Sequence, residues 1–258
     1  ITDEIKRNVM LLGKKNKYDF VITEIGGTVG DIESLPYLES IRQLKWELGK
    51  NALCVHLTYI PYLAAAGELK TKPTQHSVKE LQSVGIQPDI LVLRTEKPLN
   101  DNIRKKVANF CNVDFDAVVQ SVDMPTIYEV PVRMQEQGLD ITILKKMNMP
   151  IGNLPTLGPW KQFLERRHKA TKVLNIGLVG KYDLQDAYKS ILESLSQAGT
   201  YNDYKVKSTF INSEKITEEN VAEKLQGMDG MMICPGFGQR GIEGKIVAVH
   251  YTRTHDIP

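Results

Sequence analysis

The sequence predicts an α/β protein made of two doubly wound domains with parallel sheets. Short apolar runs rich in β-branched residues alternate with amphipathic segments, which is the pattern of successive strand–helix–strand units. A stretch rich in proline and glycine, 147–159, divides this series in two. The chain has 258 residues, enough for two cores of ordinary size. We therefore place a first domain at 1–150, a linker with a helix at 151–171, and a second domain at 172–258.

Apolar runs and helical periodicity define the elements of each domain. In the first domain, strands are expected at 18–25, 52–58, 90–94 and 117–121, with helices at 76–84 and 102–110. A connecting helix is expected at 160–170. In the second domain, strands are expected at 173–179, 206–211 and 230–234, with helices at 186–198 and 217–226. No repeat of fixed period is present, which excludes solenoids and propellers.

The composition of the chain limits which binding partners and which cellular compartment can be expected. Lys and Arg number 33 against 31 Asp and Glu, so bulk charge does not predict a nucleic-acid or membrane partner. No apolar run approaches the ~20 residues of a membrane span. The scattered Cys54, Cys111 and Cys234 suit a reducing compartment, so we expect a cytoplasmic protein. The chain starts at Ile1 and stops just after a helical pattern, which we interpret as an internal fragment.

A carboxylate and a glycine-rich turn follow the first expected strand. In open parallel sheets, ligands bind beyond the carboxyl ends of the strands. Glu24 closes the run 18–25 and is suited to bind Mg²⁺, unless it is only a solvated strand end. The turn 26–30 contains three glycines that allow backbone to approach a ligand. Asp31 and Glu33 add acceptors at an expected helix start, where Asp31 equally fits an N-cap.

Cationic and polar side chains are concentrated in the loop 67–75, before the helix expected to begin near His76. Pro73 favours an extended Lys72, so Lys70 and Lys72 are expected to reach one target. A polyphosphate is the obvious target, and solvated lysines are the alternative. We expect both lysines to share one cleft with Glu24.

A glycine-rich strand-to-helix turn occupies 234–245 in the second domain. Gly236, Gly238 and Gly241 match a dinucleotide fingerprint in spacing, but the strand before them comes late in its domain, and Pro235 immediately precedes the first glycine. Cys234 is an unsuitable nucleophile, because Pro235 has no N–H to offer an oxyanion. The remaining interpretations are a loop whose N–H groups at 236–238 bind an oxyanion, or an ordinary glycine turn.

These motifs together resemble the CTP synthase family of glutamine-dependent amidoligases. Residues 24–34 and 67–78 are similar to two signature segments of its synthetase domain, and 177–182, 186–190 and 236–245 resemble the start of its class I glutaminase domain. The resemblance implies a P-loop-type amidoligase domain followed by a class I glutamine amidotransferase domain, both incomplete. It implies a carbon–nitrogen ligase that phosphorylates UTP with ATP and aminates it to CTP with ammonia from glutamine. Mg²⁺, activation by GTP, inhibition by CTP and a homotetramer are implied as well.

The resemblance also implies roles for individual residues. Glu24 would bind magnesium, Gly236 would contact glutamine, and Lys189 would lie near the domain junction. The site for UTP and CTP would comprise Asp31, Ile32, Glu33, Lys70, Thr71, Lys72, Pro73, Thr74 and Gln75. The lid linked to GTP would comprise Phe237, Arg240, Gly241 and Glu243. The family's phosphate loop is expected before Ile1 and its Cys–His–Glu triad after Pro258, so the chain alone is expected to be inactive.

Two departures and two alternatives accompany this interpretation. Pro235-Gly236-Phe237-Gly238 stands where many family members have an extra glycine, and Val122 stands where many have a lysine that contacts the nucleotide. One alternative is a nucleotide-binding regulatory or assembly module without catalysis. The other is an NAD-dependent oxidoreductase built on 236–241.

Overall fold

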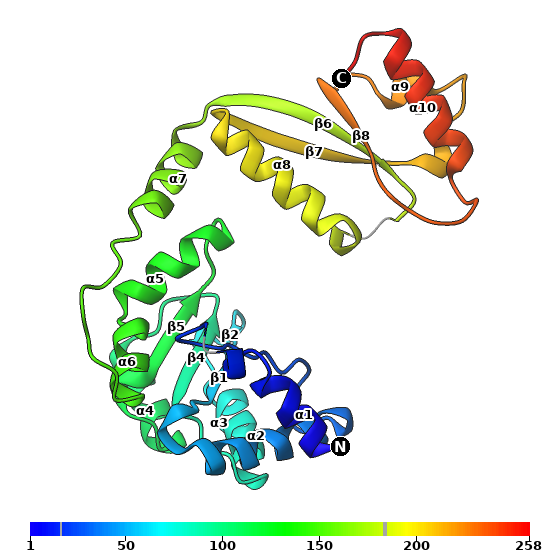
Figure 1. The fold of residues 1–258 in the computed structure, drawn as a ribbon. Helices are drawn as coiled ribbons and strands as arrows, with labels where there is room; N and C mark the ends of the chain where they lie inside the picture. Colours follow the sequence, from blue (N-terminus) through cyan, green and yellow to red (C-terminus); the bar gives the residue numbers. More distant parts are fainter. Residues whose placement is uncertain (16, 183–184) are drawn as a thin grey trace. The chain divides into compact units, whose positions relative to one another are not determined.

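The computed structural model describes residues 1–258 except 16, 183 and 184. It divides into two compact units, Ile1–Thr156 and Leu157–Pro258 (Figure 1). Each unit contains a parallel sheet with helices packed against it. The predicted α/β fold class with parallel sheets is confirmed.

The first unit is built on the parallel sheet β1–β4–β5. Its strands are β1 (Val55–Ile60), β4 (Ile90–Thr95) and β5 (Val118–Val122), and a small antiparallel pair joins β2 (Tyr62–Leu63) to β3 (Glu68–Leu69). Its helices are α1 (Thr2–Met10), α2 (Leu35–Leu48), α3 (Lys72–Ser83), α4 (Asp101–Cys111), α5 (Val130–Glu136) and α6 (Leu139–Lys146).

The core of the first unit lies between its sheet and the helices α3 and α4. Ile60, Leu91 and Val118 from the three strands are fully buried. Val78 of α3 and Val107 of α4 pack against them. The Asn100 side chain caps α4 by accepting the N–H of Ile103 at 2.9 Å. These contacts fix α3 against β1, which places the start of α3 close to the carboxyl end of that strand.

The second unit has a parallel sheet in the order β7–β6–β8. Its strands are β6 (Lys172–Gly180), β7 (Tyr204–Asn212) and β8 (Gly230–Ile233), and its helices are α7 (Gly158–Lys169), α8 (Lys189–Tyr201), α9 (Val221–Lys224) and α10 (Ile242–Thr254). The chain runs from β6 to β7 on one side and then returns to β8 on the other. This reversal of strand order at β6 is the doubly wound topology, and it creates a crevice position at the carboxyl end of the sheet.

One expected strand is wrong. Residues 18–25 form no strand, and the side chains at 18–24 are exposed. A strand requires a backbone ladder, and within the described residues β1 has its only ladder partner in β4. The apolar run 18–25 predicted a buried strand, whereas the segment is largely exposed and has no ladder partner among the described residues.

Two helix boundaries also differ from expectation. The helix expected from 76 begins at Lys72, with Pro73 in its first turn, where proline's missing N–H costs nothing. The expectation of an extended Lys72 is therefore wrong. The helix expected at 217–226 is only Val221–Lys224, because the Asn220 side chain accepts the N–H of Thr217 at 2.9 Å and stabilises a turn instead.

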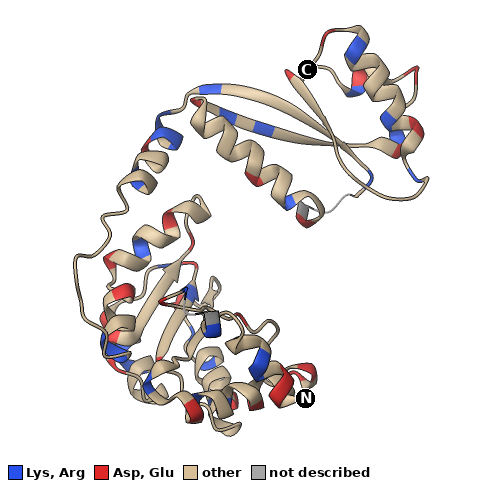
Figure 2. Ribbon diagram, viewed as in Figure 1, with Lys and Arg blue, Asp and Glu red and all other residues tan. Residues whose placement is uncertain are grey.

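Charged residues of both signs are interspersed over both units (Figure 2). Across the described part of the chain, we find no helix with the length and apolar character that crossing a membrane requires.

Candidate functional site

The glycine-rich turn of the first unit is held by Asp31. Gly27 and Gly30 have φ values of +85° and +106°, which side chains disfavour. The Thr28 N–H donates to Asp31 Oδ2 at 3.0 Å, and the Asp31 N–H donates back to the Thr28 carbonyl at 3.1 Å. Asp31 occupies the N-cap position of a 3₁₀ turn, Ile32–Ser34, but its carboxylate does not cap that turn. Asp31 therefore stabilises the turn.

A cavity of about 1610 Å³ lies beside this turn. Glu24 and Gly27 line it from the turn, Tyr59 and Arg94 line it from the ends of β1 and β4, and Pro73 lines it from α3. Ligands of open parallel sheets collect at this edge of the sheet. The structure thus brings Glu24 and the start of α3 to one cavity, as expected.

The two lysines of the predicted nucleotide site do not line that cavity. Lys70 Nζ pairs with the carboxylate of Glu68 on the β2–β3 hairpin. Lys72 Nζ lies 6.0 Å from the ring centroid of Phe110 on α4. The expectation that both lysines share a cleft with Glu24 is therefore not met in this arrangement.

The polar residues that follow Lys70 are mainly buried. Thr71, Thr74 and Gln75 are 7%, 0% and 2% exposed. Thr74 Oγ1 donates to the Tyr59 carbonyl at 2.9 Å, and Gln75 Nε2 donates to Thr71 Oγ1 at 3.2 Å. The Thr74 bond attaches the first turn of α3 to the end of β1, and the Gln75 bond stabilises the start of the helix itself. Thr71, Thr74 and Gln75, which were predicted to bind a nucleotide, thus have structural hydrogen bonds in this fold.

The sequence interpretation missed several polar groups of the same cavity. His56 Nε2 lies 2.9 Å from Ser77 Oγ, and both residues line the cavity. Burial lowers the pKa of His56 below its ordinary value, so its neutral form is favoured. The Arg94 guanidinium pairs with Asp123 at 2.8 Å. Arg94 and Asp123 stand at the ends of neighbouring strands, and that position was the signal that could have identified them.

The carboxylates of the described residues do not gather into a ready metal centre. No group of three or more His, Cys, Asp or Glu side chains with metal-binding geometry occurs among them. Glu24 is therefore a single exposed carboxylate on the wall of the cavity. Val122, the position where a lysine was expected, ends β5 and is half-buried.

In the second unit, the buried Cys234 directly follows β8 and begins the glycine-rich loop. Burial raises the pKa of its thiol, which favours the unreactive protonated form. Its carbonyl accepts a hydrogen bond from Lys245 Nζ of α10 at 2.8 Å. These observations agree with the interpretation of Cys234 as a structural residue.

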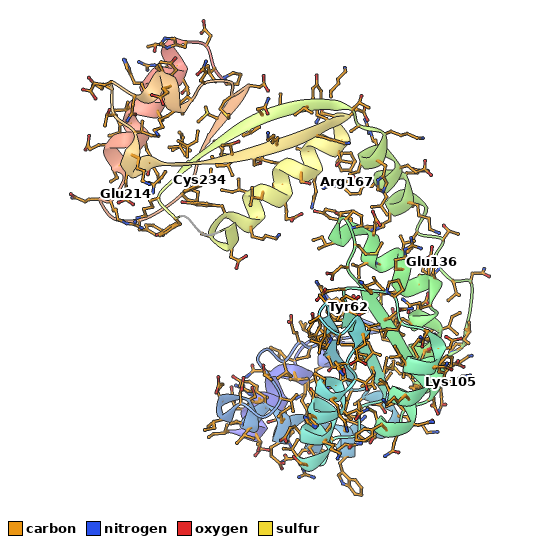
Figure 3. All side chains as sticks on the ribbon, turned by 180° about the vertical axis from the view of Figure 1, so that it is seen from behind. Tyr62, Lys105, Glu136, Arg167, Glu214 and Cys234 are labelled. Carbon is orange, nitrogen blue, oxygen red and sulfur yellow. The ribbon has the colours of Figure 1, made fainter. Side chains whose placement is uncertain are left out.

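The residues predicted to form the lid follow β8, at the same end of the second sheet. Figure 3 shows Glu214, just after β7, and Cys234, just after β8, at this end. Arg240 Nη1 pairs with Glu214 Oε1 at 2.5 Å, and its guanidinium lies 5.7 Å from the ring centroid of Tyr182. Phe237 is 95% exposed, while its carbonyl accepts a hydrogen bond from Lys181 Nζ.

Glycines allow α10 to pack directly on the turn after β7. An ideal Cβ on Gly244 would lie 1.8 Å from the Ser213 carbonyl oxygen, and one on Gly241, at φ +76°, would lie 2.4 Å from Ser213 Oγ. Both glycines are therefore required by close packing. This packing, within the unit itself, accounts for Gly241 without the dinucleotide that its spacing with Gly236 and Gly238 suggested.

Comparison with known families matches two separate parts of the chain. The family model described as CTP synthase N-terminus matches residues 1–149. The chain belongs to the CTP synthase N-terminal family. A second model, class-I glutamine amidotransferase, matches residues 183–258. The resemblance to CTP synthases stated from the sequence is thereby confirmed.

Curated relatives support the membership of this CTP synthase family. The chain is 78% identical over 260 residues to a CTP synthase of Bacteroides thetaiotaomicron, covering the whole chain and 48% of the relative. It is 73% identical over 259 residues to one of Bacteroides fragilis and 66% identical over 259 residues to one of Porphyromonas gingivalis, covering the whole chain and 49% and 48% of those relatives. The chain thus spans about half the length of the curated relatives it matches. The assignments of single site residues stay predictions.

Proposed function

We propose that the chain is part of a CTP synthase that converts UTP to CTP with ammonia taken from glutamine. The observation that carries this proposal is the succession, in one chain, of a CTP synthase N-terminal match and a class-I glutamine amidotransferase match. ATP phosphorylates O4 of UTP, and ammonia then displaces phosphate at C4. Phosphorylation converts a poor leaving group into a good one, which explains why the reaction consumes ATP.

The first unit is the proposed site for UTP and for the inhibitor CTP. Asp31–Glu33 directly follow the turn that lines the cavity, and Lys70–Gln75 include Pro73, which lines it. Lys70 and Lys72 lie at or just before the start of α3, close in sequence to Pro73, which lines the cavity. Both side chains are long and end in ammonium groups. When UTP binds, its triphosphate would replace Glu68 and Phe110 as the partner of these ammonium groups.

Glu24 is the proposed protein ligand for Mg²⁺. Magnesium is usually held by one or two carboxylates together with substrate phosphates and water, so a single exposed carboxylate on the cavity wall fits this ion. Bound Mg²⁺ supplies charge neutralisation for phosphoryl transfer. Glu24 would hold the ion in the cavity that residues of β1 and β4 also line.

The second unit is the proposed N-terminal part of the glutaminase domain. Gly236 contacts glutamine or its oxyanion, and Phe237, Arg240, Gly241 and Glu243 belong to the lid that responds to GTP. The 95% exposure of Phe237 and the reach of Arg240 from Glu214 to the Tyr182 ring support a surface that a purine nucleotide can cover. The complete protein is proposed to be a cytoplasmic homotetramer.

The experiment is an assay of the complete protein that contains this chain. With UTP, ATP, Mg²⁺ and glutamine, we expect CTP, ADP, phosphate and glutamate in equal amounts, and GTP should raise the rate. Omission of ATP or UTP should abolish CTP formation. Binding of UTP and ATP without any CTP formation contradicts the proposal and favours a non-catalytic nucleotide-binding module. Calorimetric binding of NAD by the protein would favour the oxidoreductase alternative instead.

A further inference from the structure

Lys181 is a buried lysine at the end of β6 in the second unit. The residue is 6% exposed. Among the residues that the structure describes, its ammonium forms no ion pair, and it contacts the Phe237 carbonyl and the Tyr182 ring, whose centroid lies 5.2 Å away. Burying an ammonium group costs free energy unless other groups stabilise its charge, so the two contacts favour this position of the lysine. Lys181 therefore holds the loop that begins after Cys234.

The loop backbone lies directly on the stem of Lys181. A Cβ on Gly236 would come within 2.7 Å of Lys181 Cε. The absence of a side chain at Gly236 thus allows the loop to approach the lysine. Gly238 has φ +77°, and a glycine there allows the peptide between 237 and 238 to rotate at little steric cost. Without a partner, this peptide has more than one accessible orientation.

The lysine selects one of these orientations. The carbonyl of Phe237 and the N–H of Gly238 belong to one planar peptide and point in opposite directions. Because Lys181 Nζ holds the carbonyl on its own side, the Gly238 N–H is directed away from the lysine. This contact fixes the direction of the Gly238 N–H, and the packing of Gly236 on the lysine stem restrains the start of the loop.

We propose that Lys181 is a positioning residue that holds the loop 236–238 in the one peptide orientation in which its N–H groups bind the oxyanion of glutamine hydrolysis. This inference rests on the proposed function. Oxyanion donors act only when they are preorganised, since they must point at charge that develops in the transition state. Lys181 acts through the loop and does not itself touch the substrate.

The test compares three variants of the complete protein. Lys181→Met removes the ammonium, Lys181→Arg keeps a donor, and Lys207→Met is the control because Lys207 is an exposed lysine on β7 of the same unit. We expect Lys181→Met to lower kcat for glutamine hydrolysis by roughly 10- to 100-fold with KM for glutamine within about 2-fold of wild type. Lys181→Arg should restore most of kcat. CTP formation from added ammonium chloride should stay at the wild-type rate in all three.

The outcomes separate this inference from the proposed function. A Lys181→Met protein with wild-type kcat overturns the inference, and so does a loss of kcat that Lys181→Arg does not restore. A wild-type protein that hydrolyses no glutamine overturns the proposed function and this inference with it. If Lys181→Met does not fold, Lys181→Gln replaces it, and wild-type kcat in that shorter, neutral variant overturns the inference.

Discussion

The two glycine-rich turns of the molecule are held in different ways. In the second unit, the loop after β8 and the start of α10 rest on buried groups, namely Lys181 beneath Gly236 and Ser213 beneath Gly244. In the first unit, the glycines of the turn 26–30 are exposed, and the turn is held by the local bonds between Thr28 and Asp31 and by Val29, which packs against Leu38, Leu81 and Ile86. A turn held by the core is preorganised, whereas a turn held locally can adapt to a ligand. The comparison therefore predicts that substitutions in the second turn affect folding, and those in the first affect nucleotide chemistry.

The largest expected effect concerns Glu24. In the complete protein, Glu24→Ala should lower CTP synthesis by about 100-fold or more, because Mg²⁺ serves phosphoryl transfer. Hydrolysis of glutamine should remain largely intact, because amide cleavage does not use this ion. Glu136→Ala, which removes an exposed carboxylate paired with Arg133, is the control and should leave both rates unchanged. Equal loss of both activities in Glu24→Ala would indicate misfolding and contradict the assignment.

The next effect concerns Gly244. Gly244→Ala places a methyl group against the Ser213 carbonyl and should destabilise the second unit by about 3 kcal/mol. Gly26→Ala is the control, because a Cβ there meets nothing within 4 Å, and it should change stability by less than about 1 kcal/mol. Urea unfolding followed by fluorescence measures both, since Trp46 reports on the first unit and Trp160 on the second. Equal stability of the two variants would remove the difference between the turns.

A smaller effect is expected for the two lysines. Lys70→Ala and Lys72→Ala should each weaken UTP binding by ~1.5–3 kcal/mol if their ammonium groups hold the triphosphate. Lys79→Ala is the matched control, because Lys79 Nζ also lies over Phe110, at 5.1 Å, but stands outside the predicted site. Calorimetric titration of the complete protein with UTP gives the three affinities. Unchanged affinity in the first two variants would show that they are solvated surface lysines.

The smallest effect is a pH dependence of the first unit's stability. Because burial lowers the pKa of His56 in the folded state, the unfolded chain binds the proton more readily. The stability that neutral His56 contributes is fully present above its ordinary pKa of 6.5, and it is lost as the pH falls toward the lowered pKa of the folded state. Urea unfolding between pH 7.5 and 5, followed by Trp46 fluorescence, should therefore show falling stability. His56→Gln should flatten that slope, and an unchanged slope would exclude His56 as its source.

The fold was largely predictable because its parallel strands carry apolar β-branched runs. β4, β6 and β7 were expected within two residues of their observed ends. The failure at 18–25 has a physical cause, since β propensity marks a segment that can enter a sheet but does not supply the ladder partner. The start of α3 was misplaced because Pro73 was interpreted as a helix boundary, although proline is accepted in a first helical turn.

The candidate site was predictable only in part. Glu24 and Pro73 were expected at one edge of the sheet and do line one cavity. The partners of Lys70 and Lys72 were not predictable, because a lysine's position depends on long-range neighbours such as Phe110. His56 and Ser77 are separated by 21 residues, and only the packing of α3 on β1 brings them together. The burial of Lys181 was likewise not predictable, because it arises from tertiary contacts, and the sequence placed this residue only within the segment 177–182.

Transfer of isotope from glutamine to the nucleotide tests the central claim most directly. The complete protein is supplied with UTP, ATP, Mg²⁺, GTP and glutamine labelled with ¹⁵N in its amide group. The account predicts CTP that carries one ¹⁵N at its exocyclic amine, even when unlabelled ammonium is present in the buffer. Unlabelled CTP, or labelled ammonia without any CTP, would contradict it.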